Sequence, residues 1–283
     1  AVGLQLGIWK FHKHRQPCLK KNLKLLGLFD LSYYYYYYYH NFDVMFRNFA
    51  DCENDMNWKI EAAEIESRQK MSKQQGGKHA IAKQHNKGLL TIRERLESLL
   101  DAGSLEEIGR TSGTASYDEN GKLTSFEPAN FVLGFGKISG RRVLVGGEDF
   151  TLKGGSPSQS GLRKSVYAEE LALQYKIPLV RLHEGSGGSV GSSTSKSISL
   201  PGPVNASSRF RSVAQVLSRV PVATAALGAV AGLPAGRLVA SHFSVMSKST
   251  AQILTAGPAV VARAMGEKKT KEELGGWKVH TRN

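Results

Sequence analysis

Two apolar segments that each end in a glycine-rich turn constrain the fold of this chain most. The first segment, 178–183, leads into a turn at 184–189, and the second, 222–231, leads into Gly232 and Leu233. Each pattern predicts a buried strand that stops where glycine lets the backbone turn sharply. Strands that alternate with helical segments predict an α/β fold, and periodicity alone does not narrow the class further.

The same turns could carry chemistry, because a glycine backbone can approach a ligand and present N–H groups to it. A pair of such groups can stabilise the negative charge of an enolate oxygen. The candidate donors are Gly187 and Gly188 in the first turn and Gly232 and Leu233 in the second. Pro234 follows them and has no N–H to donate. Two tight turns without a ligand are the alternative interpretation.

The remaining elements are predicted from hydrophobic spacing and turn residues. Helices are expected at 55–73, 90–101, 161–175 and 210–220, with short ones at 260–265 and 270–274. Strands are expected at 131–138, 142–146, 179–182, 222–229, 239–246 and 253–256. Irregular structure is expected at 104–125, with a turn at 118–121, and a surface loop or lid at 189–208.

Four motifs in a fixed order carry a family resemblance. They are Asp149-Phe150-Thr151-Leu152-Lys153-Gly154-Gly155-Ser156, Ser186-Gly187-Gly188, Thr255-Ala256-Gly257-Pro258 and Glu273-Leu274-Gly275-Gly276. Together they resemble the N-terminal half of the carboxyltransferase (β) subunit of biotin-dependent acyl-CoA carboxylases, of the propionyl-CoA and methylcrotonyl-CoA type. The resemblance implies a crotonase-like ββα spiral over 84–283, as a single truncated domain with an irregular N-terminal extension.

The resemblance also implies a reaction, in which carboxybiotin gives its carboxyl group to the α-carbon of an acyl-CoA. The implied cofactor is biotin, as carboxybiotin on a partner subunit or domain, and the implied substrate is a coenzyme A thioester. The implied partners are a biotin carboxylase/biotin carrier subunit and, in the full-length form, further copies of the chain. Gly154, Gly155, Arg163 and Lys164 would suit coenzyme A phosphates. A solvated basic helix face explains the two cations equally well.

The chain departs from the family pattern at several points. Gly185 stands where the family has an acidic residue before Ser-Gly-Gly, with Glu184 one position earlier. Gly232 and Leu233 stand where the family commonly has a glycine pair. No counterpart of the family's second, biotin-binding domain precedes Asn283. We therefore expect a component that is incomplete on its own.

Two alternatives stay open. A stand-alone crotonase-like hydratase or isomerase would need an acid/base carboxylate near the glycine turns, and Glu184 is the candidate. A catalytically incomplete CoA-binding fragment would bind its ligand without turnover. His183 precedes the first turn, and a structural histidine is the favoured interpretation of it.

Charge, cysteine content and hydropathy indicate whether nucleic acid, a metal ion or a membrane is an expected partner. A formal charge of +14 suits a polyanionic ligand, but no RNA-binding or zinc-finger signature occurs, so no nucleic acid partner is expected. Cys18 and Cys52 form no C-x-x-C pair, and no metal site is expected. No apolar run of about 18 residues occurs, so no membrane association is expected.

Residues 1–75 differ from the rest and are predicted to be a poorly structured or non-native extension. Seven consecutive tyrosines at 33–39 match neither the helical nor the strand period. The first residues are basic and poor in acids but hold little serine, so they fit an organelle presequence only in part. The mitochondrial matrix is the expected location, with the cytoplasm as the alternative.

Overall fold

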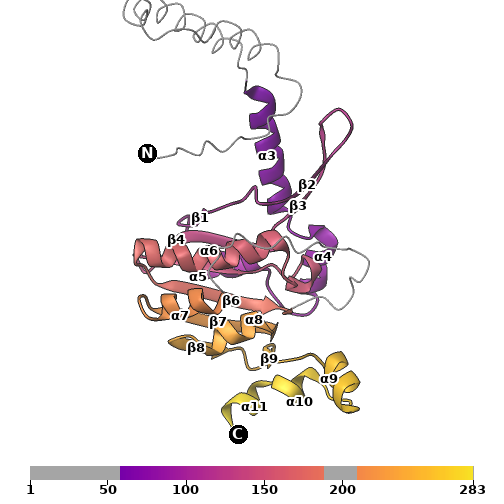
Figure 1. Cartoon of the computed structure of the whole chain (residues 1–283), viewed down its shortest axis with the longest axis vertical. Coiled ribbons are helices and arrows are strands. Elements are labelled where there is room, and N and C mark those ends of the chain that lie inside the picture. Colours follow the sequence, from indigo (N-terminus) through magenta and orange to yellow (C-terminus); the bar gives the residue numbers. More distant parts are fainter. Residues whose placement is uncertain (1–57, 188–208, 283) are drawn as a thin grey trace, which may run out of the picture. The chain divides into compact units, whose positions relative to one another are not determined.

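The computed structural model describes residues 58–187 and 209–282, and Figure 1 labels its elements. The chain divides into two compact units, 1–59 and 60–283, and the strands of the described part belong to the second. The sequence predictions for Cys18, Cys52, the tyrosine run, Gly188 and the loop at 189–208 lie outside the described residues.

A mixed sheet of seven strands is the centre of the second unit. Its order is β1 (Glu106–Glu107), β4 (Phe131–Ile138), β5 (Arg141–Glu148), β6 (Leu179–Gly185), β7 (Val222–Ala231) and β8 (Phe243–Met246), and β9 (Gln252–Leu254) also pairs with β7. β1, β4 and β5 run antiparallel, whereas every pairing from β5 to β9 is parallel. Because β5, β6 and β7 are parallel neighbours, the turns that follow them leave the same edge of the sheet.

The strands predicted at 131–138 and 142–146 are confirmed as β4 and β5, which form a hairpin. Ser139 and Gly140 form its two-residue turn, with φ of 50° and 76°. Positive φ at both positions defines a type I′ turn, whose twist matches that of the flanking strands.

Helix α5 (Ile92–Leu99) begins later than the predicted segment, because Thr91 caps it. The Thr91 side chain accepts from the Glu94 backbone N–H at 3.4 Å, and the Glu94 carboxylate accepts from the Thr91 N–H at 2.7 Å. This reciprocal pair is a capping box and satisfies two of the N–H groups that a helix start leaves unpaired.

The prediction that 104–125 is irregular is wrong, although the turn within it is confirmed. β2 (Gly113–Tyr117) and β3 (Leu123–Pro128) pair as a separate antiparallel hairpin. At the predicted turn, Gly121 donates its N–H to the Asp118 carbonyl at 3.0 Å. Most of the hairpin is exposed and polar, so it lacks the apolar alternation by which strands are recognised. Helix α4 (Gly77–His85) was not predicted either.

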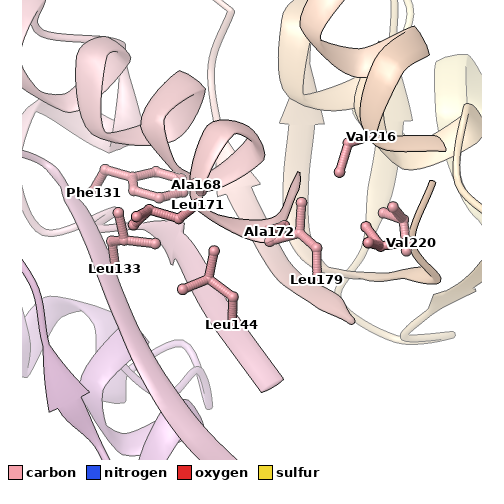
Figure 2. Close-up of a cluster of buried hydrophobic side chains, with 10 residues drawn as sticks. Phe131, Leu133, Leu144, Ala168, Leu171, Ala172, Leu179, Val216 and Val220 are labelled. Atoms are coloured by element: carbon pink, nitrogen blue, oxygen red, sulfur yellow. The ribbon is translucent and has the colours of Figure 1, made fainter. Parts of the chain in front are cut away.

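Helix α6 (Gln159–Tyr175) covers β4 and β5 and forms the largest apolar core with them. Figure 2 shows Phe131 and Leu133 of β4 beside Ala168 and Leu171 of this helix. The core extends to Val216 of α7 (Arg209–Leu217). This packing fixes α6 against the sheet, so its first turn lies next to the ends of β5 and β6.

Three short helices follow β9, namely α9 (Pro258–Met265), α10 (Lys271–Gly275) and α11 (Trp277–Thr281). No helix in the described ranges is both long and apolar enough to cross a membrane. The described side chains also form no group of three or more His, Cys, Asp or Glu that could hold a metal ion.

Candidate active site

Three glycine-containing turns from distant parts of the sequence meet at the carboxyl ends of the parallel strands. The short helix η3 (Lys153–Gly155) follows β5, and Gly187 follows β6. Gly232 follows β7 and precedes α8 (Leu233–Val239). The last two are the turns that the sequence pattern singled out, and the first contains Gly154 and Gly155, which the family resemblance indicated.

The turn after β5 is built by Asp149. Its Oδ1 accepts hydrogen bonds from the backbone N–H and the hydroxyl of Thr151, at 3.0 and 2.5 Å. Gly154 and Gly155 then adopt φ of 63° and 65°, which a side chain would disfavour. A Cβ at Gly155 would lie 2.6 Å from the Glu184 carbonyl oxygen. Glycine is therefore required for this turn to lie against the end of β6.

The turns after β6 and β7 touch each other through their main chains. A Cβ on Gly187 would lie 2.6 Å from the Gly232 Cα, and a Cβ on Gly232 would lie 2.6 Å from the Gly187 Cα. Gly232 also has φ of 67° and ψ of −133°, a conformation that essentially only glycine adopts. The structure thus brings Gly187 and Gly232 together, while Gly188 lies outside the described residues.

A cavity of about 50 Å³ lies where these turns meet. By this measure a single water needs roughly 10–15 Å³, so the described lining leaves room for a group of a few atoms. The lining residues are Asn130, Phe131, Glu148, Gly155, Pro157, Gly161, Leu162, Ser165, Gly187, Leu233, Pro234 and Arg237. Gly155, Gly187 and Leu233, three of the predicted site residues, therefore share one cavity.

The backbone N–H groups near the cavity differ in their availability. The Gly155 N–H donates to the Leu152 carbonyl at 3.0 Å and so closes its own turn. The N–H groups of Gly187, Gly232 and Leu233 donate to no acceptor within the described residues. Their role as oxyanion donors stays a prediction. Of the three residues, Gly187 and Leu233 line the cavity.

Sequence reasoning missed Glu148, the carboxylate that lines this cavity. The Nδ1 atom of His183, on the neighbouring strand, lies 3.2 and 3.1 Å from its two oxygens. Burial alone would raise the pKa of Glu148, but the charge and hydrogen bond of His183, with the charge of Arg181, hold that pKa below its usual value. Glu148 is thus ionised at neutral pH. The sequence signal that could have indicated Glu148 is its position directly after the apolar run 143–147, where a buried strand ends.

Glu184, the acid/base candidate of the hydratase alternative, is not among the residues that line the cavity. Its Oε2 forms an ion pair with Arg95 at 2.5 Å, and its Oε1 accepts from the Gln84 amide at 2.9 Å. A Cβ on Gly228 would lie 2.4 Å from the same carboxylate, so the side chain packs against β7. Glu184 therefore links the sheet to α4 and α5 rather than facing a ligand.

Two buried arginines share one carboxylate behind the cavity. Arg181 Nη2 and Arg237 Nε lie 2.8 and 2.9 Å from Glu169 Oε1. Ser212 donates its hydroxyl to the other oxygen of Glu169, and Arg237 Nη1 donates to the Ser165 hydroxyl at 3.0 Å. Burial, followed by the charge of Arg237, lowers the pKa of Arg181 to about 10, so the Arg181 guanidinium remains charged at neutral pH. This cluster fixes α8 against α6 and β6.

Arg163 and Lys164, the predicted coenzyme A cations, have different surroundings. Arg163 is exposed, whereas Lys164 is buried and donates from Nζ to the Gly109 carbonyl at 3.2 Å. Burial lowers the pKa of Lys164 to about 8, against the opposing charge of Glu107. Neither side chain lines the cavity. Their coenzyme A role stays a prediction.

Lys164 is expected to make stability rise with pH. The folded chain releases its proton near pH 8, whereas a free lysine holds it to about 10.5. Between these values the unfolded state binds more protons, so the free energy of unfolding increases with pH, by roughly 2 kcal/mol at most from pH 8 to 10. Urea unfolding of Lys164→Met at pH 8, 9 and 10 tests this, because the variant should lack that increment. Parallel pH profiles for both proteins would contradict it.

Comparison with known proteins identifies the family. Residues 83–283 match the family model described as Carboxyl transferase domain. The propionyl-CoA carboxylase beta chain of Cereibacter sphaeroides is 32% identical over 221 residues, which are 77% of this chain and 42% of that relative. The chain belongs to the carboxyl transferase domain family.

A second relative matches this carboxyl transferase domain over nearly the same number of residues. The biotin-dependent acetyl-/propionyl-coenzyme A carboxylase beta5 subunit of Mycobacterium tuberculosis is 32% identical over 220 residues, covering 77% of this chain and 39% of that subunit. The chain thus spans about two fifths of the length of these relatives.

Solved structures confirm the predicted fold. Transcarboxylase 12S, crystallised with methylmalonyl-coenzyme A and methylmalonic acid bound, superposes with a TM-score of 0.63 at 27% identity, covering 77% of this chain and 41% of that one. The beta subunit of Pseudomonas aeruginosa geranyl-CoA carboxylase gives a TM-score of 0.59 at 28% identity, covering 78% and 39%. The carboxyl transferase domain therefore has the crotonase-like α/β fold that the resemblance implied.

Proposed function

We propose that this carboxyl transferase domain binds an acyl-CoA and stabilises the enolate of its thioester during carboxyl transfer from carboxybiotin. The observation that carries the proposal is the contact between the Gly187 and Gly232 turns on a cavity with two backbone donors, Gly187 and Leu233. Each donor aimed at the developing negative charge would contribute roughly 2.7–4 kcal/mol to the transition state. Such donors need no titratable group.

The size and lining of the cavity fit the reacting end of a thioester. Its volume of about 50 Å³ accommodates a carbonyl and the adjacent α-carbon rather than a whole acyl-CoA. Phe131, Leu162 and Pro157 supply an apolar wall, and Asn130, Glu148, Ser165 and Arg237 supply polar side chains. A short acyl chain of the propionyl type is the substrate class that the names of the curated relatives support, and a methylcrotonyl chain stays the alternative.

Carboxybiotin would supply the carboxyl group, carried by a biotin carboxylase/biotin carrier subunit or domain. The Mycobacterium tuberculosis relative is biotin-dependent by name, which supports a biotin-carrying partner. Transcarboxylase 12S is described as a hexamer, which supports a homo-oligomeric assembly here. The human propionyl-CoA carboxylase beta chain, 31% identical over 219 residues, is mitochondrial by name. We propose the mitochondrial matrix as the location, with the cytoplasm as the alternative.

Calorimetric titration of the 283-residue chain with propionyl-CoA, methylcrotonyl-CoA and free coenzyme A tests the binding step. Both thioesters should bind more tightly than free coenzyme A, because the cavity receives the acyl end. A second arm adds a biotin-carrying partner and follows the carboxylated acyl-CoA by mass spectrometry. No binding by a demonstrably folded sample would overturn the proposal. Binding without transfer, in the presence of a competent partner, would favour the CoA-binding alternative.

We also propose that residues 84–283 are the functional domain and that residues 1–75 are dispensable for its fold. The family match begins at residue 83. α3 (Lys59–Lys73) touches the β2–β3 hairpin, where the Tyr117 hydroxyl donates to Glu64 at 2.9 Å, but only Ser72 of this helix is buried.

A chain that begins at Lys78 is therefore expected to melt within about 2–4 °C of the full chain, the shift that roughly 1 kcal/mol produces in a domain of this size. Differential scanning calorimetry provides the measurement. A chain that begins at Trp58 is the control, because it keeps α3. Loss of a cooperative transition in the shorter chain alone would show that α3 belongs to the folding unit.

A further inference from the structure

A second, smaller cavity lies beside the cluster of Glu169 and its two arginines, and the proposed function does not use it. Its volume is about 10 Å³, and by the same measure one water needs roughly 10–15 Å³. The cavity lies among α6, β6, α7, β7 and α8, and its lining residues are Glu169, Leu179, Arg181, Val213, Val216, Leu217, Val222, Arg237 and Ala240. It therefore has room for one water-sized particle and is too small for a carboxylate, a phosphate or a sulfate.

Each arginine in this lining has one terminal nitrogen without an acceptor. Arg181 and Arg237 are only 2% and 5% exposed. Arg181 Nη2 donates to the Ser165 carbonyl at 2.9 Å and to Glu169 at 2.8 Å, and Arg237 Nη1 donates to the Ser165 hydroxyl at 3.0 Å. By contrast, Arg181 Nη1 and Arg237 Nη2 are buried and donate to no group within the described residues. Because a buried N–H without an acceptor is costly, an occupant that accepts from both would stabilise the folded chain.

The lining favours an anion over a water molecule. Two guanidinium groups share one carboxylate there, so a neutral occupant would leave an excess of positive charge buried. A water would also have to donate its own protons. Among the described lining side chains Glu169 is the one acceptor, and its oxygens already contact Arg181, Arg237 and Ser212. A halide ion only accepts, which matches two unpaired donors.

We propose that this cavity binds one chloride ion, held by Arg181 Nη1 and Arg237 Nη2. The apolar side chains that α7 and β7 contribute to the lining keep water away from the ion, which strengthens its attraction to the guanidinium groups. The ion joins β6, which carries Arg181, to α8, which carries Arg237. Because α8 begins at Leu233, chloride also stabilises the helix that contributes a wall residue to the larger cavity.

Urea unfolding of the full chain at increasing sodium chloride tests the site, with the total ionic strength held constant by sodium gluconate, whose anion is too large for the cavity. A ligand that binds only the folded state raises the free energy of unfolding by about 1.4 kcal/mol for each tenfold increase in its concentration above the Kd. We expect this slope, which corresponds to one chloride per chain. Equal stability in chloride and in gluconate would overturn the proposal, because the cavity would then hold water only.

Bromide, which replaces chloride at halide sites, locates the ion by its anomalous X-ray scattering. Crystals of the full chain grown in sodium bromide should show an anomalous difference peak between the guanidinium groups of Arg181 and Arg237. Bromide peaks at other places and none in this cavity would overturn the assignment, even if chloride stabilises the chain.

A cavity-filling variant tests the location in solution. Val213→Ile adds a methylene group to a lining side chain and takes up the space of the ion, so its stability should be the same in chloride and in gluconate. Val239→Ile is the matched control, because Val239 is exposed on α8 and is not among the lining residues, and it should keep the full chloride dependence. Full chloride dependence in Val213→Ile would place the ion elsewhere and overturn the assignment. The wild-type titration and the bromide peak decide the proposal even if Val213→Ile does not fold.

Discussion

Glu169→Gln is expected to lower the free energy of unfolding by about 3–5 kcal/mol, the usual effect of removing one partner from a buried ion pair. Glu169 is 1% exposed and is the carboxylate that Arg181 and Arg237 share. Its neutralisation leaves two buried guanidinium groups without the carboxylate that lies between them. Urea unfolding at pH 7 measures the change. Native domains have a free energy of unfolding of roughly 5–15 kcal/mol, so this substitution would remove a large fraction of it.

Glu170→Gln is the matched control, because the adjacent carboxylate is exposed on the same helix. Its substitution should change the free energy of unfolding by less than about 0.5 kcal/mol. Similar values for the two variants would show that the buried cluster contributes no net stability. That result is physically conceivable, because the desolvation of three charges opposes their attraction.

Gly232→Ala should remove acyl-CoA chemistry in the reconstituted enzyme. The new Cβ would lie 2.6 Å from the Gly187 Cα, and alanine at φ 67° and ψ −133° would be strained by about 1–3 kcal/mol. The turn must move, and Leu233 then loses its alignment. Loss of one donor costs roughly a hundredfold to a thousandfold in rate. Steady-state carboxyl transfer, with the fold checked by circular dichroism, gives the measurement.

Gly236→Ala is the control on the same helix. A Cβ there has no heavy atom within 4 Å, and alanine favours a helix over glycine by about 0.8–1 kcal/mol. This variant should be as active as the wild type and slightly more stable. Equal loss of activity in both variants would mean that α8 as a whole, rather than the turn before it, is sensitive to substitution.

The strands that end at the glycine turns could be predicted from the sequence because the residues that indicate them are neighbours along the chain. Apolar runs of strand length and glycines at their ends identify the turns at Gly187 and Gly232 without knowledge of any distant contact. The turn after β5 is also local, since Asp149 bonds to Thr151 only two residues away. By contrast, the polar strands of the β2–β3 hairpin carry no such local apolar signal.

The pairing of the charged groups could not be predicted, because it depends on register between strands. Gly147 of β5 lies opposite Leu182 of β6, and this alignment places Glu148 beside His183. Glu184, the next residue along β6, belongs to a different environment and pairs with Arg95, 89 positions away. Sequence proximity to a glycine turn pointed to Glu184, whereas the sheet register places Glu148 at the cavity.

The contact between Gly187 and Gly232 has a consequence for genetics. Each residue excludes a side chain on the other, and neither can become smaller, because glycine already has none. A substitution at one position cannot be relieved by a compensating substitution at the other. A selection for restored function after Gly232→Ala should therefore yield true revertants at codon 232 and no intragenic suppressors at codon 187.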